Sequence, residues 1–188
     1  MTKIIFLGGV AGVGKSTLLS HSLEKLGNKV TLVDPGELFR KNFYLEKRKT
    51  IYEIEDLIVE EILDKAILSS AVIVHWHYAV LRPEGYIPQI NLERLKRVAE
   101  SGVVGEVTLV LIEAPAELIL ERRQKNVGVK TRPLSLEVIH DEMAHERDYF
   151  EKEFDIFSKA LGVDRMKKII IDNTDLEMTE KRVLDTIF

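Results

Sequence analysis

A glycine-rich segment near the N-terminus contains the residues whose types and spacing specify the most definite chemistry. Its residues are Gly9, Val10, Ala11, Gly12, Val13, Gly14, Lys15, Ser16 and Thr17. They fit the pattern G-x-x-x-x-G-K-[ST] between an apolar strand-like run and an apolar helix-like run. Glycines let such a loop direct consecutive N–H groups at phosphate oxygens, and the start of a helix adds partial positive charge. Lys15 supplies a point charge to the β- and γ-phosphates, and the Ser16 hydroxyl can ligate Mg²⁺. The loop therefore predicts binding of a nucleoside triphosphate and Mg²⁺.

Two asparagines are candidates for a guanine-binding motif, which would indicate that the bound triphosphate is GTP. A GTPase needs N-K-x-D after a strand, and neither Asn126, in QKNVG, nor Asn173, in DNTD, is followed by lysine. The chain length also argues against large ATPase modules with added domains. The small ATP-dependent kinases remain, and these need an acceptor pocket and cations that close over the phosphates.

The second apolar run leads into VDPGELFR at 33–40. Gly36 permits a tight turn and Arg40 offers a bidentate fork suited to phosphate, although an ordinary helix start with a solvated arginine explains the same residues. The spacing of Gly36, Glu37 and Arg40 resembles the G-[DE]-x-x-R segment that opens the nucleoside-monophosphate pocket of adenylate kinases. The resemblance implies that Arg40 holds the acceptor phosphate and that Glu37 lies near a metal-bound water.

The third apolar run ends in His75-Trp76-His77, and the residues RPEGYIPQ follow at 82–89. This stretch resembles the D-x-H…P-x-G-Y-x-P pattern of short archaeal adenylate kinases and of the related adenylate-kinase-like ATPases of ribosome assembly. The resemblance places His77 and Gln89 on the acceptor side of the cleft, as substrate-binding residues.

His75 departs from that resemblance, because the family has an aspartate there that orients water on Mg²⁺. A neutral imidazole cannot replace the charge of a carboxylate. Either Asp34 or Glu37 compensates, or catalysis is weak or directed elsewhere. A metal ion shared by His75 and His77 is a further alternative, since residues i and i+2 of a strand face one side, but no third ligand stands out nearby in sequence.

Cations cluster after the fourth apolar run, at Arg122, Arg123, Lys125, Lys130, Arg132 and Arg147. A phosphoryl-transfer transition state spreads charge over equatorial oxygens, which arginines in a water-excluded cleft stabilise. The arrangement resembles the short LID of nucleoside monophosphate kinases, here at about 123–133. It implies four catalytic arginines: Arg122, Arg123, Arg132 and Arg147. A basic helix end favoured by the helix dipole explains Arg122 or Arg123 alone, and which of these two is catalytic stays open.

Asn173-Thr174-Asp175 follows the last apolar run. It resembles the loop that contacts the donor base in the same family, with Asn173 as the nucleotide-binding residue. The same residues suit the N-cap of a final helix. Both interpretations remain open.

These residues need a scaffold that brings several strand ends together. Apolar runs rich in β-branched residues occur at 3–8, 29–33, 71–75, 107–112 and 168–172, and each is typical of a strand buried on both faces. Segments with helical spacing alternate with them at 15–26, 52–69, 92–101, 116–125, 135–161 and 175–187. The alternation predicts an α/β, three-layer P-loop fold with a five-stranded parallel sheet flanked by helices. No linker or repeat interrupts it, so residues 1–188 are expected to form a single domain with a monophosphate-binding region at about 34–70.

The composition excludes several classes of function. The 188 residues include no cysteine, which rules out disulfide frameworks, thiolate metal sites and cysteine nucleophiles. Twenty-seven Lys and Arg against 31 Asp and Glu leave a net charge of −4, so no DNA partner is expected. Neither a signal-like segment nor an apolar run of membrane-spanning length is present, which predicts a cytoplasmic protein without a membrane partner.

These observations together predict an ATP- and Mg²⁺-dependent phosphotransferase that acts on a small phosphorylated substrate. The resemblance implies the reaction of Mg·ATP with a nucleoside monophosphate to give ADP and a nucleoside diphosphate. Two alternatives stay open. One is a kinase for a different small acceptor, and the other is an adenylate-kinase-like ATPase whose nucleotide state controls assembly of ribosomal or other RNA–protein particles.

Overall fold

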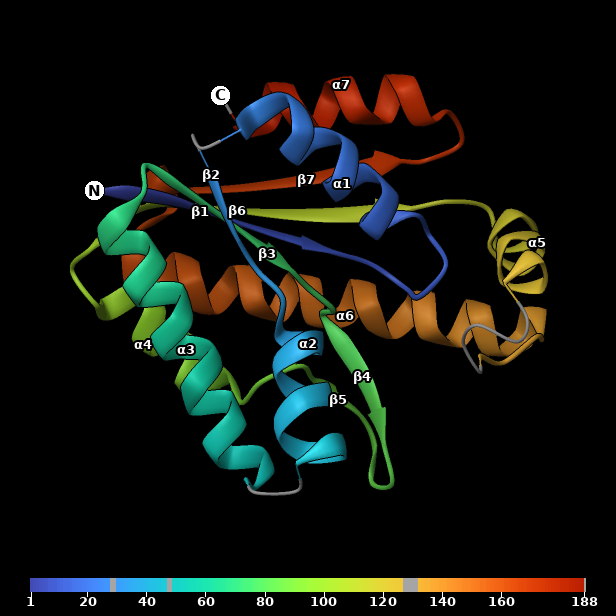
Figure 1. The fold of residues 1–188 in the computed structure, drawn as a ribbon, viewed down its shortest axis with the longest axis horizontal. Helices are drawn as coiled ribbons and strands as arrows, with labels where there is room; N and C mark the ends of the chain where they lie inside the picture. Colours follow the sequence, from blue (N-terminus) through green and yellow to red (C-terminus); the bar gives the residue numbers. More distant parts are fainter. Residues whose placement is uncertain (28–29, 47–48, 127–131, 188) are drawn as a thin grey trace.

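Five parallel strands form the central sheet of the computed structural model, which describes residues 1–27, 30–46, 49–126 and 132–187. They are β1 (Thr2–Gly8), β2 (Val30–Val33), β3 (Ala71–His75), β6 (Val104–Glu113) and β7 (Met166–Asp172), in the order β2-β3-β1-β6-β7 (Figure 1). Every neighbouring pair is parallel. The predicted parallel sheet is therefore confirmed, with helical crossovers joining its strands.

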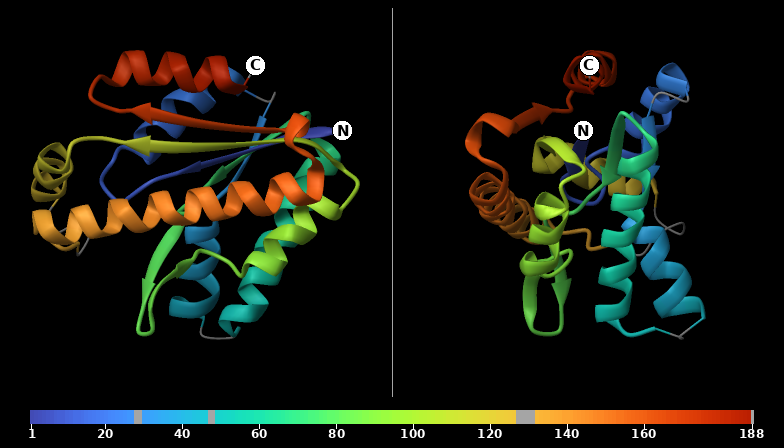
Figure 2. Two further views of the ribbon diagram at one scale, coloured as in Figure 1. Left: turned by 180° about the vertical axis from the view of Figure 1, so that it is seen from behind. Right: turned by 90° about the vertical axis from the view of Figure 1, so that its left-hand side faces the viewer.

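Helices cover both faces of this sheet (Figures 1 and 2). One face carries α1 (Lys15–Leu26) and α7 (Leu176–Ile187), and the other carries α3 (Ile51–Leu68), α4 (Leu92–Glu100) and α6 (Leu136–Leu161). Within β1, Ile4 and Phe6 pack into the core beneath α3, α4 and α6, while Ile5 and Leu7 pack beneath α1 and α7. Neighbours along a strand point to opposite faces, so a strand covered on both sides is apolar throughout.

The helices expected from sequence spacing all occur, each with its ends within one residue of the prediction; they include α5 (Ala116–Lys125). The additional elements are α2 (Pro35–Phe39), the π-helical segment η2 (Arg40–Leu45), the hairpin strands β4 (Ala79–Arg82) and β5 (Gly85–Pro88), and the short helix η3 (Val163–Arg165). These elements are too short to show a hydrophobic period. No helix in the part of the chain that the structure describes is long and apolar enough to cross a membrane.

The carboxyl ends of the strands meet along one edge of the sheet, where the chemistry-bearing residues lie. The glycine-rich loop follows β1, Asp34 follows β2, His75 ends β3 and Asn173 follows β7. Ligand sites of parallel α/β sheets lie outside this edge. The fold thus brings together residues that are far apart in sequence.

Candidate active site

One cavity of about 550 Å³ lies at this edge, and most of the predicted site residues line it. The predicted residues on its wall are Val10, Ala11, Gly12, Gly14, Lys15, Ser16, Thr17, Gly36, Arg40, His77, Arg122, Arg132 and Asn173. The wall also includes Asp34, His75, Asn126 and Leu176. The predicted residues that do not line it are Gly9, Val13, Glu37, Gln89, Arg123 and Arg147. The phosphate-binding loop, the arginine predicted to hold the acceptor and two of the four predicted catalytic arginines therefore share one cavity.

The glycine-rich loop adopts a backbone that glycine tolerates and other residues do not. The φ angles are +134° at Gly9, +92° at Gly12 and +109° at Gly14. A Cβ atom at Gly14 would overlap the side-chain amide of Asn173. The helix α1 starts directly after Gly14, which provides no side-chain cap. The N–H groups of the first turn therefore stay available to an anion.

Lys15 is only 4% exposed and is folded against the loop. Its Nζ donates hydrogen bonds to the carbonyl of Gly9 and, at 3.2 Å, to that of Val10. Burial lowers the pKa of the ammonium group to about 8, and the carboxylate of Glu146 only partly offsets this effect. A bound γ-phosphate would give the ammonium group an anionic partner in place of these carbonyls.

Arg122 and Asn173 connect the loop to the end of β7. Arg122 donates to the carbonyls of Val13 and Asn173, both at 2.9 Å, and Asn173 Nδ2 donates to Val13 at 2.7 Å. Asn173 Oδ1 is buried, and no described residue donates to it, so a ligand donor has an acceptor there. The first turn of α7 is capped by Asp175, whose Oδ1 accepts from the N–H of Met178 at 2.8 Å. Asn173 is therefore placed to contact a ligand, whereas Asp175 provides the N-cap of the final helix.

Arg123 lies behind the loop and outside the cavity, with its side chain fully buried. Its Nε and Nη2 donate to the carbonyl of Ala11 at 2.9 and 2.8 Å, and its Nη1 donates to that of Pro133 at 3.1 Å. The carboxylate of Glu142 also pairs with Nη2. This geometry favours Arg122 over Arg123 as the arginine that faces bound phosphates.

The other two predicted catalytic arginines differ in position. Arg132 lines the cavity, and burial lowers the pKa of its guanidinium group. Arg147 lies outside the cavity wall and is exposed, where it forms a bidentate ion pair with Glu113 whose Nη2–Oε2 distance is 2.6 Å. Of the predicted LID at 123–133, residues 127–131, which include Lys130, lie outside the described residues. Only Arg132 of this pair is placed where it could contact a transferring group.

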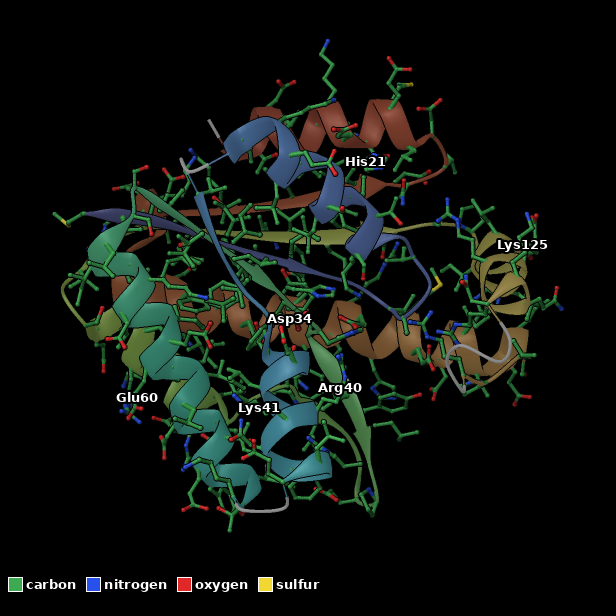
Figure 3. All side chains as sticks on the ribbon, viewed as in Figure 1. His21, Asp34, Arg40, Lys41, Glu60 and Lys125 are labelled. Carbon is green, nitrogen blue, oxygen red and sulfur yellow. The ribbon has the colours of Figure 1, made fainter. Side chains whose placement is uncertain are left out.

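Arg40 reaches the cavity from the junction of α2 and η2. The helix starts there because Asp34 Oδ1 accepts from the N–H of Glu37 at 3.2 Å and Pro35 occupies the first turn. Figure 3 shows Asp34 and Arg40 along this one helical segment. Among the described residues no carboxylate forms an ion pair with Arg40, so its guanidinium group is available to an anionic ligand.

His75 contacts the carboxylate that begins this segment. Its Nδ1 lies 3.4 Å from Asp34 Oδ2. Burial tends to raise the pKa of Asp34, but the hydrogen bond and charge of His75 and the nearby backbone N–H groups outweigh it, so the pKa lies below its ordinary value. Asp34 is therefore an ionised carboxylate on the cavity wall.

His77 contacts a different carboxylate. Its Nδ1 lies 3.0 Å from Glu146 Oε1, and its backbone N–H donates to Gln89 Oε1 at 2.6 Å. Gln89 thus fixes the backbone beside His77 without reaching the cavity. No group of three or more metal-ligating side chains occurs among the described residues, so the alternative of an ion shared by His75 and His77 receives no support.

Three residues near the cavity carry no pattern that predicts them as site residues: Asn126, Leu176 and Glu146. Asn126 and Leu176 lie on the wall without belonging to a motif. Glu146 is 3% exposed and accepts from the backbone N–H of Tyr78 at 2.7 Å as well as contacting His77. Its only sequence signal is an acid at the spacing of the buried face of α6.

The oxygen donors on the wall fit Mg²⁺. Two of them are the Ser16 hydroxyl and the Asp34 carboxylate, which line the same cavity as the loop that would hold phosphates. Mg²⁺ keeps several waters and takes few protein ligands beside substrate phosphates. A wall with few oxygen donors is therefore sufficient for this ion.

A protein-family model described as an AAA domain matches residues 8–140. The chain is similar to the adenylate kinase of Pyrococcus abyssi, with 25% identity over 138 residues, covering 68% of this chain and 67% of the relative. It is similar to the adenylate kinase of Methanocaldococcus jannaschii, with 26% identity over 153 residues, covering 74% and 75%.

Two solved structures share the fold. A gluconokinase from Sinorhizobium meliloti 1021 has a TM-score of 0.51 and 16% identity, covering 98% of this chain and 91% of its own. A shikimate kinase from Acinetobacter baumannii in complex with shikimate has a TM-score of 0.50 and 20% identity, covering 100% and 93%. With the glycine-rich loop, these likenesses identify the three-layer α/β fold of P-loop kinases.

Proposed function

The chain belongs to the family described as an AAA domain, and from this premise we propose that it transfers the γ-phosphoryl group of ATP to a nucleoside monophosphate. It is an ATP-dependent phosphotransferase of the P-loop kinase type. Its similarity to two adenylate kinases, at 25% and 26% identity, supports a nucleotide as the acceptor.

The observation that carries the proposal is that Lys15 and Arg40 line one cavity. Lys15 and the loop amides suit the donor phosphates, and Arg40, which has no ion-pair partner among the described residues, supplies a guanidinium fork for a second phosphate. A cavity with cations at both places suits two phosphorylated ligands better than one. The acceptor region in this proposal is the segment 34–70.

Transfer between two phosphates requires positioning and charge stabilisation. In the proposed step an oxygen of the acceptor phosphate forms a bond to the γ-phosphorus, while the bond from that phosphorus to the β,γ-bridging oxygen breaks and ADP leaves. Arg122 and Arg132 would stabilise the equatorial oxygens. The acceptor is already an anion, so no side chain has to remove a proton.

Mg²⁺ would be held by the Ser16 hydroxyl, the phosphates and water. When bound, it neutralises charge that develops on the β- and γ-phosphate oxygens. Ser16 lies in the first turn of α1 and lines the cavity, so the helix places this residue beside the loop.

A hydroxyl acceptor is the second candidate, and the pair formed by His77 and Glu146 favours it. If Glu146 accepts from Nδ1–H, Nε2 of His77, which has no hydrogen-bond partner among the described residues, can accept a proton. Burial and the charge of Lys15 lower the pKa of His77, which keeps the ring neutral at pH 7. A hydroxyl oxygen would then bond to the γ-phosphorus as its proton passes to His77 and ADP leaves.

A coupled assay of ADP formation tests the first candidate. The acceptors are AMP, CMP, UMP, GMP and dAMP, and Lys15→Ala is the control for transfer that depends on the loop. At least one monophosphate should accelerate ADP formation in the wild-type protein and not in the control. If none does, the proposal is wrong.

The same assay separates the alternatives. Turnover of sugars or other alcohols that is lost in His77→Gln, with no turnover of monophosphates, would identify the hydroxyl-acceptor kinase. ATP hydrolysis stimulated by ribosomal components, with no acceptor phosphorylated, would identify an adenylate-kinase-like ATPase that acts in particle assembly.

A further inference from the structure

Asp34 is the only carboxylate on the cavity wall among the described residues. The cationic side chains on the wall are those of Lys15, Arg40, Arg122 and Arg132. The negative charge of Asp34 repels the phosphates of a bound nucleotide and lowers its affinity, unless a metal ion lies between the carboxylate and the phosphates. The composition of the wall therefore connects Asp34 with a cation that accompanies the nucleotide.

The sheet register places Asp34 beside the residue that departs from the family pattern. Strands β2 and β3 are parallel, and their last paired residues are Val33 and Val74. Asp34 and His75 follow these two residues directly, so they occupy equivalent positions on strands about 4.8 Å apart. The carboxylate of Asp34 on β2 therefore lies one strand away from the position on β3 where the resembling kinases have an aspartate.

Two contacts hold the carboxylate in place. Oδ1 accepts from the backbone N–H of Glu37 at 3.2 Å, and Oδ2 lies 3.4 Å from His75 Nδ1. The Asp34 side chain remains 31% exposed and lines the cavity, whereas Glu37 does not line it. Of the two acids that could compensate for His75, only Asp34 is therefore placed to do so.

We propose that Asp34 orients the water shell of the Mg²⁺ ion that accompanies ATP, and that His75 is a positioning residue that holds its carboxylate. In this proposal Asp34 on β2 takes the function that the β3 aspartate has in the resembling kinases, and His75 on β3 holds the Asp34 carboxylate. This inference rests on the proposed use of Mg·ATP and is independent of the acceptor.

The test measures ATP affinity by calorimetry, with Mg²⁺ and with EDTA, in the full chain. Asp34→Asn keeps an equally good N-cap and an acceptor for His75, so the fold is retained. Loss of the charge should lower the Mg²⁺-dependent gain in ATP affinity about tenfold. With EDTA the variant should bind ATP more tightly than the wild type, because a repulsive charge is gone. Glu37→Gln is the matched control and should match the wild type in both conditions.

A second variant returns the charge to the neighbouring strand. In Asp34→Asn combined with His75→Asp, the carboxylate lies on β3, and the Mg²⁺-dependent gain should recover. Equal affinity changes with and without Mg²⁺ in Asp34→Asn would overturn the inference. So would an unchanged Mg²⁺-dependent gain with turnover lost, because Asp34 would then act on the acceptor. If the wild type binds no ATP at all, the proposed function fails as well.

Discussion

The guanidinium group of Arg123 donates two hydrogen bonds to the same carbonyl oxygen, that of Ala11, at 2.9 and 2.8 Å. Ala11 lies at the crown of the phosphate-binding loop, between its positive-φ glycines. An arginine that the resemblance offers, beside Arg122, as a catalytic candidate thus supports the loop from behind. Its charge is balanced by Glu142 of α6, so the ion pair links the loop to that helix.

Replacement of Arg123 should therefore affect stability first. Arg123→Met leaves the Glu142 carboxylate and the Ala11 carbonyl without their donor, and the free energy of unfolding should fall by about 3 kcal/mol. Arg147→Met is the control, because its ion pair with Glu113 is exposed and should cost less than ~1 kcal/mol. Urea unfolding of both variants measures the difference. Equal losses would contradict the assignment of Arg123 as a buried support.

Lys15 should make both stability and ATP binding depend on alkaline pH. Burial lowers its pKa from 10.5 to about 8, so the folded protein binds fewer protons than the unfolded chain between these values. The contribution of Lys15 to the free energy of unfolding should then rise with pH across that window, by about 3 kcal/mol in total. ATP affinity should fall over the same window, because neutral Lys15 no longer attracts phosphate.

Lys15→Arg is the control for this titration. Arginine stays charged throughout the window. Its ATP affinity, measured by calorimetry at successive pH values, should therefore be independent of pH even if it is weaker overall. A wild-type affinity that does not change between the two pKa values would contradict the prediction.

Arg40 should determine the affinity for the acceptor and leave the donor unaffected. Loss of a charged hydrogen bond to phosphate costs about 1.5–3 kcal/mol, so Arg40→Gln should raise the KM for a monophosphate by about 10- to 100-fold. The KM for ATP should remain unchanged. Lys41→Gln is the neighbouring control, since Figure 3 shows Lys41 on a different side of the segment from Arg40. If both variants raise the acceptor KM equally, general charge is responsible and not Arg40.

Glu153 should make the protein less stable as the pH rises. Its side chain is fully buried, and burial together with the charge of Glu146 raises its pKa well above the ordinary value, although Trp76 donates to it at 3.0 Å. The folded state therefore retains a proton that the unfolded chain releases, and the contribution of Glu153 to stability decreases as the pH rises above about 4.5.

Glu153→Gln keeps an acceptor for Trp76 and cannot ionise. Relative to the wild type, its free energy of unfolding should be similar in acid and higher near pH 8. Subtracting the free energy of unfolding of one protein from that of the other at each pH cancels the contributions of all other titrating groups. A difference that is constant with pH would show that Glu153 does not carry the buried proton.

Local patterns in the sequence were enough to predict the sheet, the helices and the phosphate-binding loop. The apolar runs predict strands because burial on both faces leaves no position for a polar side chain. The loop is predictable because three of its glycines have positive φ, a requirement that acts within nine residues of chain. The hairpin of β4 and β5 escapes prediction because strands of four residues show too little alternation.

Only the tertiary structure decided which charged residues face the ligand. Arg122 and Arg123 are adjacent on α5 and equal in sequence terms, yet one lines the cavity and the other is buried. Glu142, which lies 19 residues further along, and the carbonyl of Ala11 determine that choice. Asp34 becomes a cavity carboxylate through the register of β2 with β3. The period of a helix or strand records burial and backbone hydrogen bonding, whereas the partner of a charge depends on segments distant in sequence that folding brings together.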